Sequence, residues 1–334
     1  MNRRHGASEA VWQTYARAGN DRGPGATVRS PNPLCTLTAP IGFAVIDKPA
    51  GLTSHACVAR IRRVLGTRRV GHGGTLDPAV TGVLPIAVGQ ATRLLPYLPG
   101  DKTYRGVIQL GVTTGTDDLQ GAVLSRKPPP ELNRISLEQA LSVFRGSISQ
   151  RPPQVSAVHV DGERAHARAR RGEVMDLPAR TVTLHRLELL NWDPAQAQLE
   201  VEVHCTAGTY IRSLARDLGE ALGCGGALAE LRRIEALGFR ADQAVPLPEA
   251  PEQVGAGSLT LLRPELALPH LPQRMLTASE QEDWSCGRRL GPDPHGTPPA
   301  DAVVVISEGG RMLGLGLLDG EGGLKPKVVF EARG

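Results

Sequence analysis

The sequence predicts an α/β protein in which a mixed, largely antiparallel sheet carries helices and is followed by a small β-barrel. Three observations lead to this prediction. Residues 180–192 and 197–212 alternate apolar and polar side chains, as paired strands do. Residues 53–65 and 136–146 combine capping residues with apolar side chains at helical spacing. The tail, from about residue 260, consists of short apolar runs divided by glycine turns, which favours a barrel over a helical unit.

Regular structure is expected to begin at Ile41. Residues 41–49, IGFAVIDKP, are typical of a short buried strand that ends in a proline turn. Residues 53–65 then follow as a helix with a Thr/Ser cap. Residues 82–93 and 102–114, beyond a glycine-rich loop, are rich in β-forming residues and broken by glycine and proline. We therefore expect strands before and after the loop.

The second half of the chain opens with a punctuated stretch. Residues 147–178 are basic and rich in turn residues, as a long functional excursion would be. Residues 213–226 predict a helix stopped by glycine, and residues 227–234, ALAELRRI, are also expected to be helical. Residues 301–320 and 324–330 predict short strands split by glycine turns.

The length indicates more than one domain. A chain of 334 residues exceeds the roughly 250 to 300 residues at which a single core stops growing. Residues 1–38 lack a hydrophobic period and are rich in glycine, proline, serine, arginine and asparagine, so we expect a flexible extension there. We expect the main domain over residues 39–250 and the small barrel over residues 258–334.

Composition excludes several classes of protein. No apolar run approaches the roughly 18 residues that span a bilayer, and the first residues lack the apolar core of a secretory signal, so a cytoplasmic protein is predicted. The five cysteines are scattered without a CxxC pair, which indicates neither a disulfide framework nor a zinc site. No Walker loop, Rossmann loop or HExxH-like histidine pair is present. We therefore expect neither a cofactor nor a catalytic metal.

Positive charge is concentrated in one part of the chain. Residues 41–110 carry nine Lys/Arg against three Asp/Glu, whereas residues 251–334 carry eight against eleven. The segment RIRRVLGTRR alone holds five arginines, namely Arg60, Arg62, Arg63, Arg68 and Arg69. Such a run is either a solvated helix face or a surface for a phosphate-rich partner, and the two interpretations have similar weight from the run alone.

A single carboxylate stands beside this basic segment. The stretch GHGGTLDPAVTG places Asp77 between glycines, which let backbone approach a ligand, and Pro78, which fixes the chain after it. An ordinary Asp-Pro turn with a local cap is one interpretation. The cationic surroundings favour a catalytic role for this carboxylate instead. No second acid lies nearby in the sequence, so a two-carboxylate glycosidase is not indicated. A single ionised carboxylate is suited to covalent or elimination chemistry at a sugar carbon.

Five motifs then give a family resemblance. In order along the chain they are DKP at 47–49, the stretch GHGGTLDPAVTGVLPIAVGQATR from residue 71, KTYRGVIQLG at 102–111, RPPQVSA at 151–157 and GTYIRSLARDLGEAL at 208–222. Together they resemble the bacterial tRNA pseudouridine-55 synthases over residues 41–245. The tail resembles the small RNA-binding PUA barrel that often ends such chains. The resemblance implies the pseudouridine synthase fold over 39–250 and a PUA-like domain over 258–334.

The resemblance also implies a reaction and roles for single residues. The reaction is isomerisation of one uridine in the T loop of tRNA, without a cofactor and after the nucleotide has flipped out of the RNA. Asp77 would be the catalytic carboxylate, which either attacks C1′ or removes the C2′ proton to give a glycal. Arg212 would hold that carboxylate. The remaining positions that match are Tyr104, which packs against the flipped uracil and is a candidate for C5 deprotonation, His72, Tyr210 and Leu231 as substrate contacts, and Lys48, which serves the fold or the RNA backbone.

Some positions depart from the family pattern. Val155, His159 and His166 stand where the family commonly has other residues, so the contacts of that region are open. Two alternatives also stay open. One is the RNA-guided relative that modifies ribosomal RNA with partner proteins. The other is a non-catalytic tRNA-binding or tRNA-folding module. For the leading interpretation we expect a monomer that acts on tRNA without an obligatory protein partner.

Overall fold

The structure is a computed structural model. It describes residues 40–156, 158–160, 162–250, 259–294, 296, 298, 300–330 and 332. The extension predicted over residues 1–38 lies outside the described residues.

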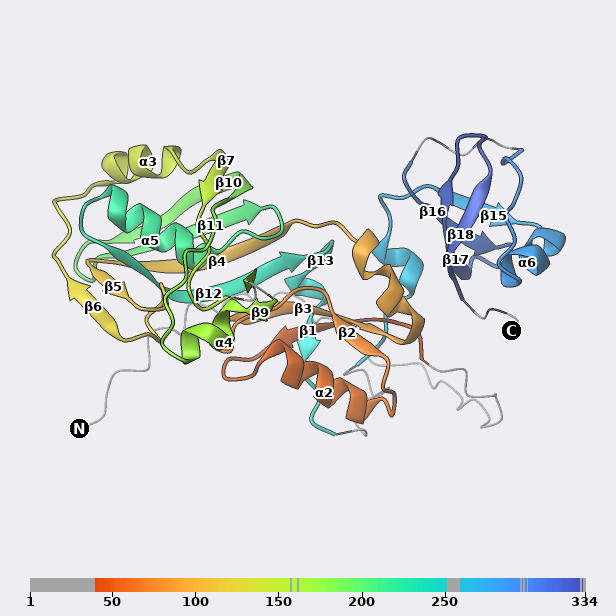
Figure 1. The fold of residues 1–334 in the computed structure, drawn as a ribbon, viewed down its shortest axis with the longest axis horizontal. Helices are drawn as coiled ribbons and strands as arrows, with labels where there is room; N and C mark the ends of the chain where they lie inside the picture. Colours follow the sequence, from red (N-terminus) through yellow and green to blue (C-terminus); the bar gives the residue numbers. More distant parts are fainter. Residues whose placement is uncertain are drawn as a thin grey trace, which may run out of the picture. The chain divides into compact units, whose positions relative to one another are not determined.

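A large mixed sheet forms the main body (Figure 1). Most neighbouring strands run antiparallel, while β12 pairs with β3 and β14 pairs with β1 in parallel. This arrangement confirms the predicted fold class. The main path follows the order β14 (Val245–Pro246), β1 (Gly42–Lys48), β3 (Thr81–Val88), β12 (Gly226–Ala236), β4 (Lys102–Leu110), β11 (Gln198–Cys205), β10 (Arg180–Asp193) and β7 (Gly146–Gln150), with β2 (Val70–His72) beside β3 and β13 (Phe239–Arg240) beside β12.

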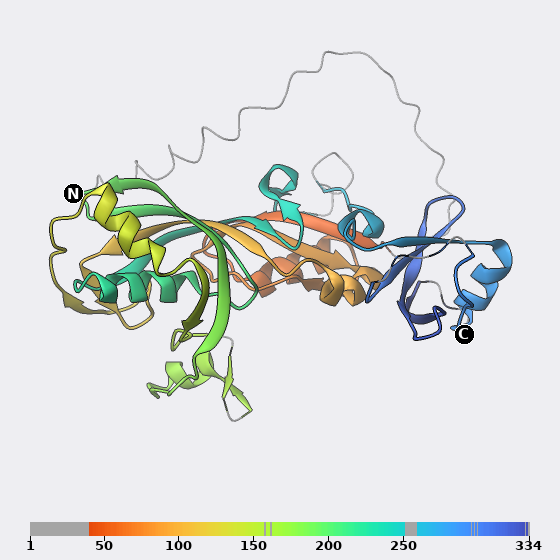
Figure 2. The same ribbon diagram turned by 90° about the horizontal axis from the view of Figure 1, so that it is seen from above.

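Three helices pack into one hydrophobic core with this sheet. They are α2 (Ser54–Val64), α3 (Arg134–Ser142) and α5 (Ile211–Ala221). Each helix presents buried apolar residues at helical spacing, such as Val58 and Ile61 in α2. Figure 2 shows α2 and α5 on the same face of the sheet. That face is where the candidate site forms.

The strand β1 is buried on both faces, as its sequence predicts. Ala44 and Ile46 belong to the core beneath the helices. Phe43 and Val45 belong to a second cluster, which also contains Val304 of the C-terminal sheet. Alternate side chains of a strand point to opposite faces, so the run 43–46, which is buried on both faces, is apolar at successive positions.

The C-terminal segment folds as a four-stranded sheet with one helix against it. The elements are β15 (Gln273–Leu276), α6 (Ala278–Ser285), β16 (Val303–Ser307), β17 (Met312–Leu318) and β18 (Leu324–Val329). Trp284 of α6 is buried and donates from Nε1 to the Leu313 carbonyl at 3.1 Å. Because Ala39–Gly334 form one compact unit, the division at 250 and 258 stays a prediction.

The remaining elements are short. They are the 3₁₀ helices η1 (Gly89–Tyr97), η2 (Ala241–Gln243) and η4 (Pro264–Ala267), the hairpins β5 (Val112–Thr114) with β6 (Val123–Arg126) and β8 (His159–Val160) with β9 (Glu163–Arg164), and the helix α4 (Ala165–Arg170). Among the residues described, no helix is both long enough and apolar enough to cross a membrane.

Two sequence predictions of helices need correction. Residues 227–234 are not helical but lie in β12, where bulges near Leu228 and Arg233 interrupt the pairing with β4. A bulge breaks the alternation of a strand, so its apolar residues imitate helical spacing. The helix predicted over 136–146 covers Arg134–Ser142, so it both begins and ends earlier than expected. Asn133 caps the N-terminus of this helix and forms a capping box with Ser136, the third helical residue.

Candidate functional site

The loop between β2 and β3 carries Asp77. Hydrogen bonds from buried side chains to the backbone of this loop hold it in place. The buried Ser54 hydroxyl accepts from the Leu76 N–H at 2.8 Å and lies 3.1 Å from the Leu76 carbonyl. Lys48 Nζ donates to the Pro78 carbonyl at 3.1 Å. The residues on both sides of Asp77 are therefore held, which fixes where its carboxylate emerges.

Lys48 is fully buried, and its ammonium group also donates to the carbonyls of Pro49 and Leu52. Burial lowers the pKa of Lys48, while the nearby charge of Asp77 raises it. The sequence allowed a role in the fold or at the RNA backbone. Complete burial agrees with the role in the fold, since an ammonium group without exposed surface does not reach RNA.

Arg233 supports the same loop and is a residue that the sequence analysis missed. It lies in β12, has no exposed surface, and donates from Nε to the Val83 carbonyl at 2.8 Å and from Nη2 to the Gly74 carbonyl at 3.2 Å. Gly74 has a φ of 111°, a conformation that favours glycine. Arg233 Nη1 has no hydrogen-bond partner among the described residues. A buried cation thus lies directly beneath the aspartate loop.

Arg212 brings a second part of the chain to Asp77. It is the second residue of α5, and its Nη2 lies 3.0 Å from Asp77 Oδ2. Its guanidinium also donates to the Thr116 carbonyl at 3.0 Å and the Val155 carbonyl at 2.9 Å. These carbonyls fix the guanidinium before any substrate binds, so it orients the carboxylate.

Asp77 is less isolated and less enclosed than its sequence context suggests. Asp118 Oδ2 lies 3.7 Å from Arg212 Nη1, so two carboxylates share the guanidinium. The side chain of Arg212 is 8% exposed and that of Asp77 is 46% exposed. The guanidinium is therefore buried, while the carboxylate faces outward from it.

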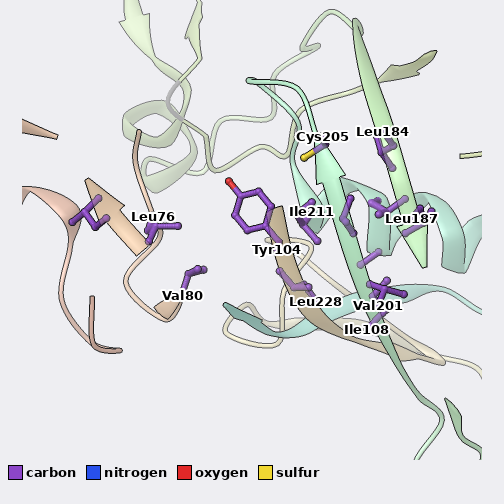
Figure 3. Packing of buried hydrophobic residues seen from close by; sticks show 14 of the residues in the cluster. Leu76, Val80, Tyr104, Ile108, Leu184, Leu187, Val201, Cys205, Ile211 and Leu228 are labelled. Carbon is purple, nitrogen blue, oxygen red and sulfur yellow. The ribbon is translucent and has the colours of Figure 1, made fainter. Parts of the chain in front are cut away.

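Tyr104 lies between the two segments that supply the ion pair. Figure 3 shows its ring between Leu76, which precedes Asp77, and Ile211, which precedes Arg212. Burial raises the pKa of the Tyr104 phenol, and the charge of Arg233 opposes this only in part. The phenol is therefore neutral at pH 7, and it offers an aromatic ring and a hydroxyl rather than a phenolate.

Leu231 and Tyr210 extend this surface. Leu231 of β12 pairs with Gly106 of β4, two residues from Tyr104 and thus on the same face of the sheet. Tyr210 precedes α5. The buried Gln150 side chain accepts from its N–H at 2.8 Å and donates to its carbonyl at 3.1 Å. The segment that leads into Arg212 is therefore anchored to β7.

His72 ends β2, just before the aspartate loop. Its Nδ1 is buried without a hydrogen-bond partner among the described residues. Burial lowers the pKa of His72, and the charge of Arg233 lowers it further. The imidazole is therefore neutral at pH 7, which suits a contact by packing or hydrogen bonding.

One departure from the family pattern leaves the site intact. Val155 contacts Arg212 through its carbonyl, a group that every residue carries. His159 lies in β8 and His166 in α4, and the side chains of both are outside what the structure describes. Within the arginine run, Arg62 donates to the Val70 carbonyl at 2.8 Å, whereas Arg63, Arg68 and Arg69 are exposed. Part of the run thus supports the fold and part faces solvent.

Comparison with known proteins assigns this arrangement to a family. The sequence model described as TruB family pseudouridylate synthase (N terminal domain) matches residues 62–211, and the model of the tRNA pseudouridylate synthase B C-terminal domain matches residues 212–254. The chain belongs to the TruB family. Asp77 and Tyr104 fall within the first match, and Arg212 is the first residue of the second.

Relatives in the TruB family cover nearly the whole chain. A protein named tRNA pseudouridine synthase B from Synechococcus sp. strain WH7803 is 74% identical over 302 residues, which are 89% of this chain and 100% of that protein. Its namesake from Prochlorococcus marinus strain MIT 9313 is 56% identical over 89% of this chain and 100% of its own length. Among solved structures, one chain of a Cbf5–Nop10–Gar1 complex is similar, with 27% sequence identity and a TM-score of 0.64. The match covers 86% of this chain and 84% of that chain.

For this TruB family chain, replacing Arg233 tests the support beneath the loop. We expect Arg233→Met to lower the free energy of unfolding by about 2 kcal/mol, because the Val83 and Gly74 carbonyls lose their donor. The matched change Arg232→Met removes a partly exposed pair with Asp47 and should cost at most about 1 kcal/mol. Urea denaturation measures both values. Equal losses in the two variants would contradict the assigned support.

The lowered pKa of His72 predicts a pH dependence of stability. In the unfolded chain its pKa is about 6.5, and in the folded chain it is lower. Stability from this group is therefore complete above about pH 6.5 and is lost as the pH falls through the folded pKa. Urea midpoints measured between about pH 7.5 and pH 5 should fall less steeply in His72→Gln than in the wild type. Identical slopes would show that His72 is not responsible.

Proposed function

We propose that the chain converts uridine 55 in the T loop of tRNA to pseudouridine. The main support for the proposal is the ion pair of Asp77 with Arg212, in which Asp77 Oδ2 lies 3.0 Å from Arg212 Nη2. It occurs in a member of the TruB family, and a relative that is 74% identical is named tRNA pseudouridine synthase B. The family and the enzyme class follow from these similarities.

The reaction is an isomerisation and needs no other reactant. The bond between N1 of uracil and C1′ of ribose breaks, the base turns, and a bond forms between C5 and C1′. The proton on C5 is lost and N1 gains one, so the product has the same composition as the substrate. The protein has to stabilise charge at the ribose, hold the detached base and transfer a proton.

Asp77 is the residue that acts at the ribose in this proposal. Its carboxylate either attacks C1′ or takes the proton from C2′, and both routes need an ionised group with a defined direction. Arg212 supplies the charge partner and fixes that direction, since backbone carbonyls already orient its guanidinium. Asp118 shares the same cation.

The base would lie beside Tyr104 after leaving the RNA stack. The ring of Tyr104, with Leu231 on the same face and Tyr210 before α5, offers an apolar wall for the flipped uracil. His72 would contact the RNA near the vacated position. Because 46% of the Asp77 side chain is exposed in the free chain, bound RNA would complete the enclosure that protects the intermediate from water.

Recognition of the rest of the tRNA is assigned to the basic and C-terminal surfaces. The exposed arginines Arg63, Arg68 and Arg69 of the basic run are suited to phosphates. Residues 258–334 would act as the PUA-like RNA-binding domain. We propose that the protein acts as a monomer in the cytoplasm, without an obligatory protein partner.

The test uses purified chain without guide RNA or other proteins. Position-resolved sequencing of an unmodified tRNA transcript should show one pseudouridine, at position 55, and none in a transcript with cytidine at that position. Dependence on a guide RNA and partner proteins would instead favour the RNA-guided alternative. Binding without any product would favour a non-catalytic tRNA-binding or tRNA-folding module.

A further inference from the structure

Three potential metal ligands lie close together on the face of the large sheet that is opposite to Tyr104. They are Asp101, just before β4, His185 of β10 and His204 of β11, and their ligand atoms all lie within 4.8 Å of one another. His204 pairs with Thr103, whereas Val203 pairs with Tyr104. Because side chains alternate along a strand, this group faces away from Tyr104. It is therefore separate from the aspartate site.

The spacing of these atoms is suited to a transition-metal ion. With bonds of about 2.0 to 2.2 Å, two donors on a tetrahedral zinc ion lie about 3.3 to 3.6 Å apart. Asp101 Oδ2 lies 3.4 Å from His185 Nε2 and 3.8 Å from His204 Nε2. The ligand atoms of His185 and His204 lie at most 4.8 Å apart. Coordination of one ion therefore requires side-chain movement, and the exposed ring of His185 has room for it.

A partly buried hydrogen-bond chain orients His204. Thr103 Oγ1 lies 3.0 Å from His204 Nδ1 and donates its proton to Glu235 Oε2 at 3.3 Å. A hydroxyl has one proton, so Thr103 accepts from Nδ1–H of His204. In the neutral ring, Nε2 then presents a lone pair towards the Asp101 carboxylate. Such outer partners are typical of metal-binding histidines.

A β-bulge in β10 sets the direction of the His185 side chain. The pairing of β10 with β11 shifts between Leu184 and Arg186, so His185 is the extra residue of a β-bulge. A bulge re-aims a side chain relative to the regular strand. Here it brings His185 beside His204, with the two ring centroids 5.2 Å apart.

We propose that Asp101, His185 and His204 form a surface site for one divalent transition-metal ion of the zinc class. Two imidazoles and one carboxylate are a ligand set that such ions accept, with water completing the coordination. The ion would tie together the neighbouring strands β10 and β11 and the start of β4. Its role is to stabilise the sheet and not to take part in chemistry at the ribose.

The test measures Zn²⁺ binding to the full chain by isothermal titration calorimetry. The wild type should bind one ion through this group and gain thermal stability with zinc concentration. His185→Ala, at an exposed position, should weaken binding at least tenfold, and Thr103→Val should weaken it about 10- to 100-fold by removing the outer partner. Both variants should show a smaller zinc-dependent gain in melting temperature than the wild type at the same zinc concentration.

The controls are His55→Ala and Cys286→Ser, which change an exposed histidine and an exposed cysteine elsewhere. Both should bind Zn²⁺ as the wild type does. Unchanged affinity in His185→Ala, or lost affinity in either control, would place the ion elsewhere and overturn the proposal. The absence of binding heat in the wild type would also overturn it.

Discussion

The Asp77→Asn variant is expected to form pseudouridine at least about 10⁴-fold more slowly than the wild type, the scale on which enzymes lose rate when a nucleophile is removed. Asparagine keeps the size of the side chain but supplies neither an attacking carboxylate nor a base. The loop should stay in place, because its anchors Ser54, Lys48 and Arg233 are unchanged. Single-turnover rates with unmodified tRNA measure the effect, and filter binding should show tRNA affinity within about threefold of the wild type.

Asp118→Asn is the matched control, because Asp118 shares the guanidinium of Arg212 at 3.7 Å. It removes the same charge from the same cation without touching the proposed catalytic atom. We expect its rate to stay within about tenfold of the wild type. Similar rates for the two variants would mean that net charge around Arg212, rather than the carboxylate of Asp77, determines activity.

Arg212→Lys is expected to slow the reaction by about 10²- to 10³-fold, although the positive charge is retained. The guanidinium contacts Asp77, Asp118 and the carbonyls of Thr116 and Val155 simultaneously. A lysine ammonium is a point charge on a flexible stem and does not reproduce this planar fork. The carboxylate therefore keeps a partner but loses its fixed direction. The loss should appear in kcat more than in KM.

Arg216→Lys controls for general effects on α5. Arg216 lies one turn further along that helix and pairs with Asp117 at 2.8 Å. We expect its kcat within about tenfold of the wild type, since it does not contact Asp77. A loss equal to that of Arg212→Lys would indicate that both arginines act only by holding α5 in place.

Much of the fold could be predicted from local pattern. The strand 41–49 is apolar at successive positions because both of its faces are buried. The helix α2 combines the Thr53 cap with apolar residues at helical spacing. The strands β10 and β11 alternate in polarity, and they pair as the sequence predicts. In each case the local pattern and the tertiary environment agree.

The strand β12 shows where local pattern fails. Its bulges disturb the alternation of side chains, and its Arg233 is fully buried although arginine is rarely found without exposed surface. A buried arginine is retained there because it satisfies carbonyls of two other segments. Those partners are distant in the sequence, so no local signal predicts them.

The site itself was predictable only in part. A constrained carboxylate at Asp77 follows from the glycines and proline around it, whereas its partner Arg212 was identified through the family resemblance. The sequence gives no sign that Asp118 reaches the same guanidinium, since it belongs to a different loop. The departure at Val155 leaves the contacts of its region open in the sequence, and the contact with Arg212 uses the Val155 backbone carbonyl. Backbone contacts of this kind leave no trace in residue identity.

The most direct test of the central claim follows the proton on C5 of uracil. Unmodified tRNA is prepared with tritium at C5 of its uridines and incubated with purified chain alone. We predict release of one tritium per tRNA by the wild type and none above background by Asp77→Asn, although both bind the tRNA. Release at the same rate from the variant, or none from the wild type, would contradict the assignment of Asp77 as the residue that acts on the ribose.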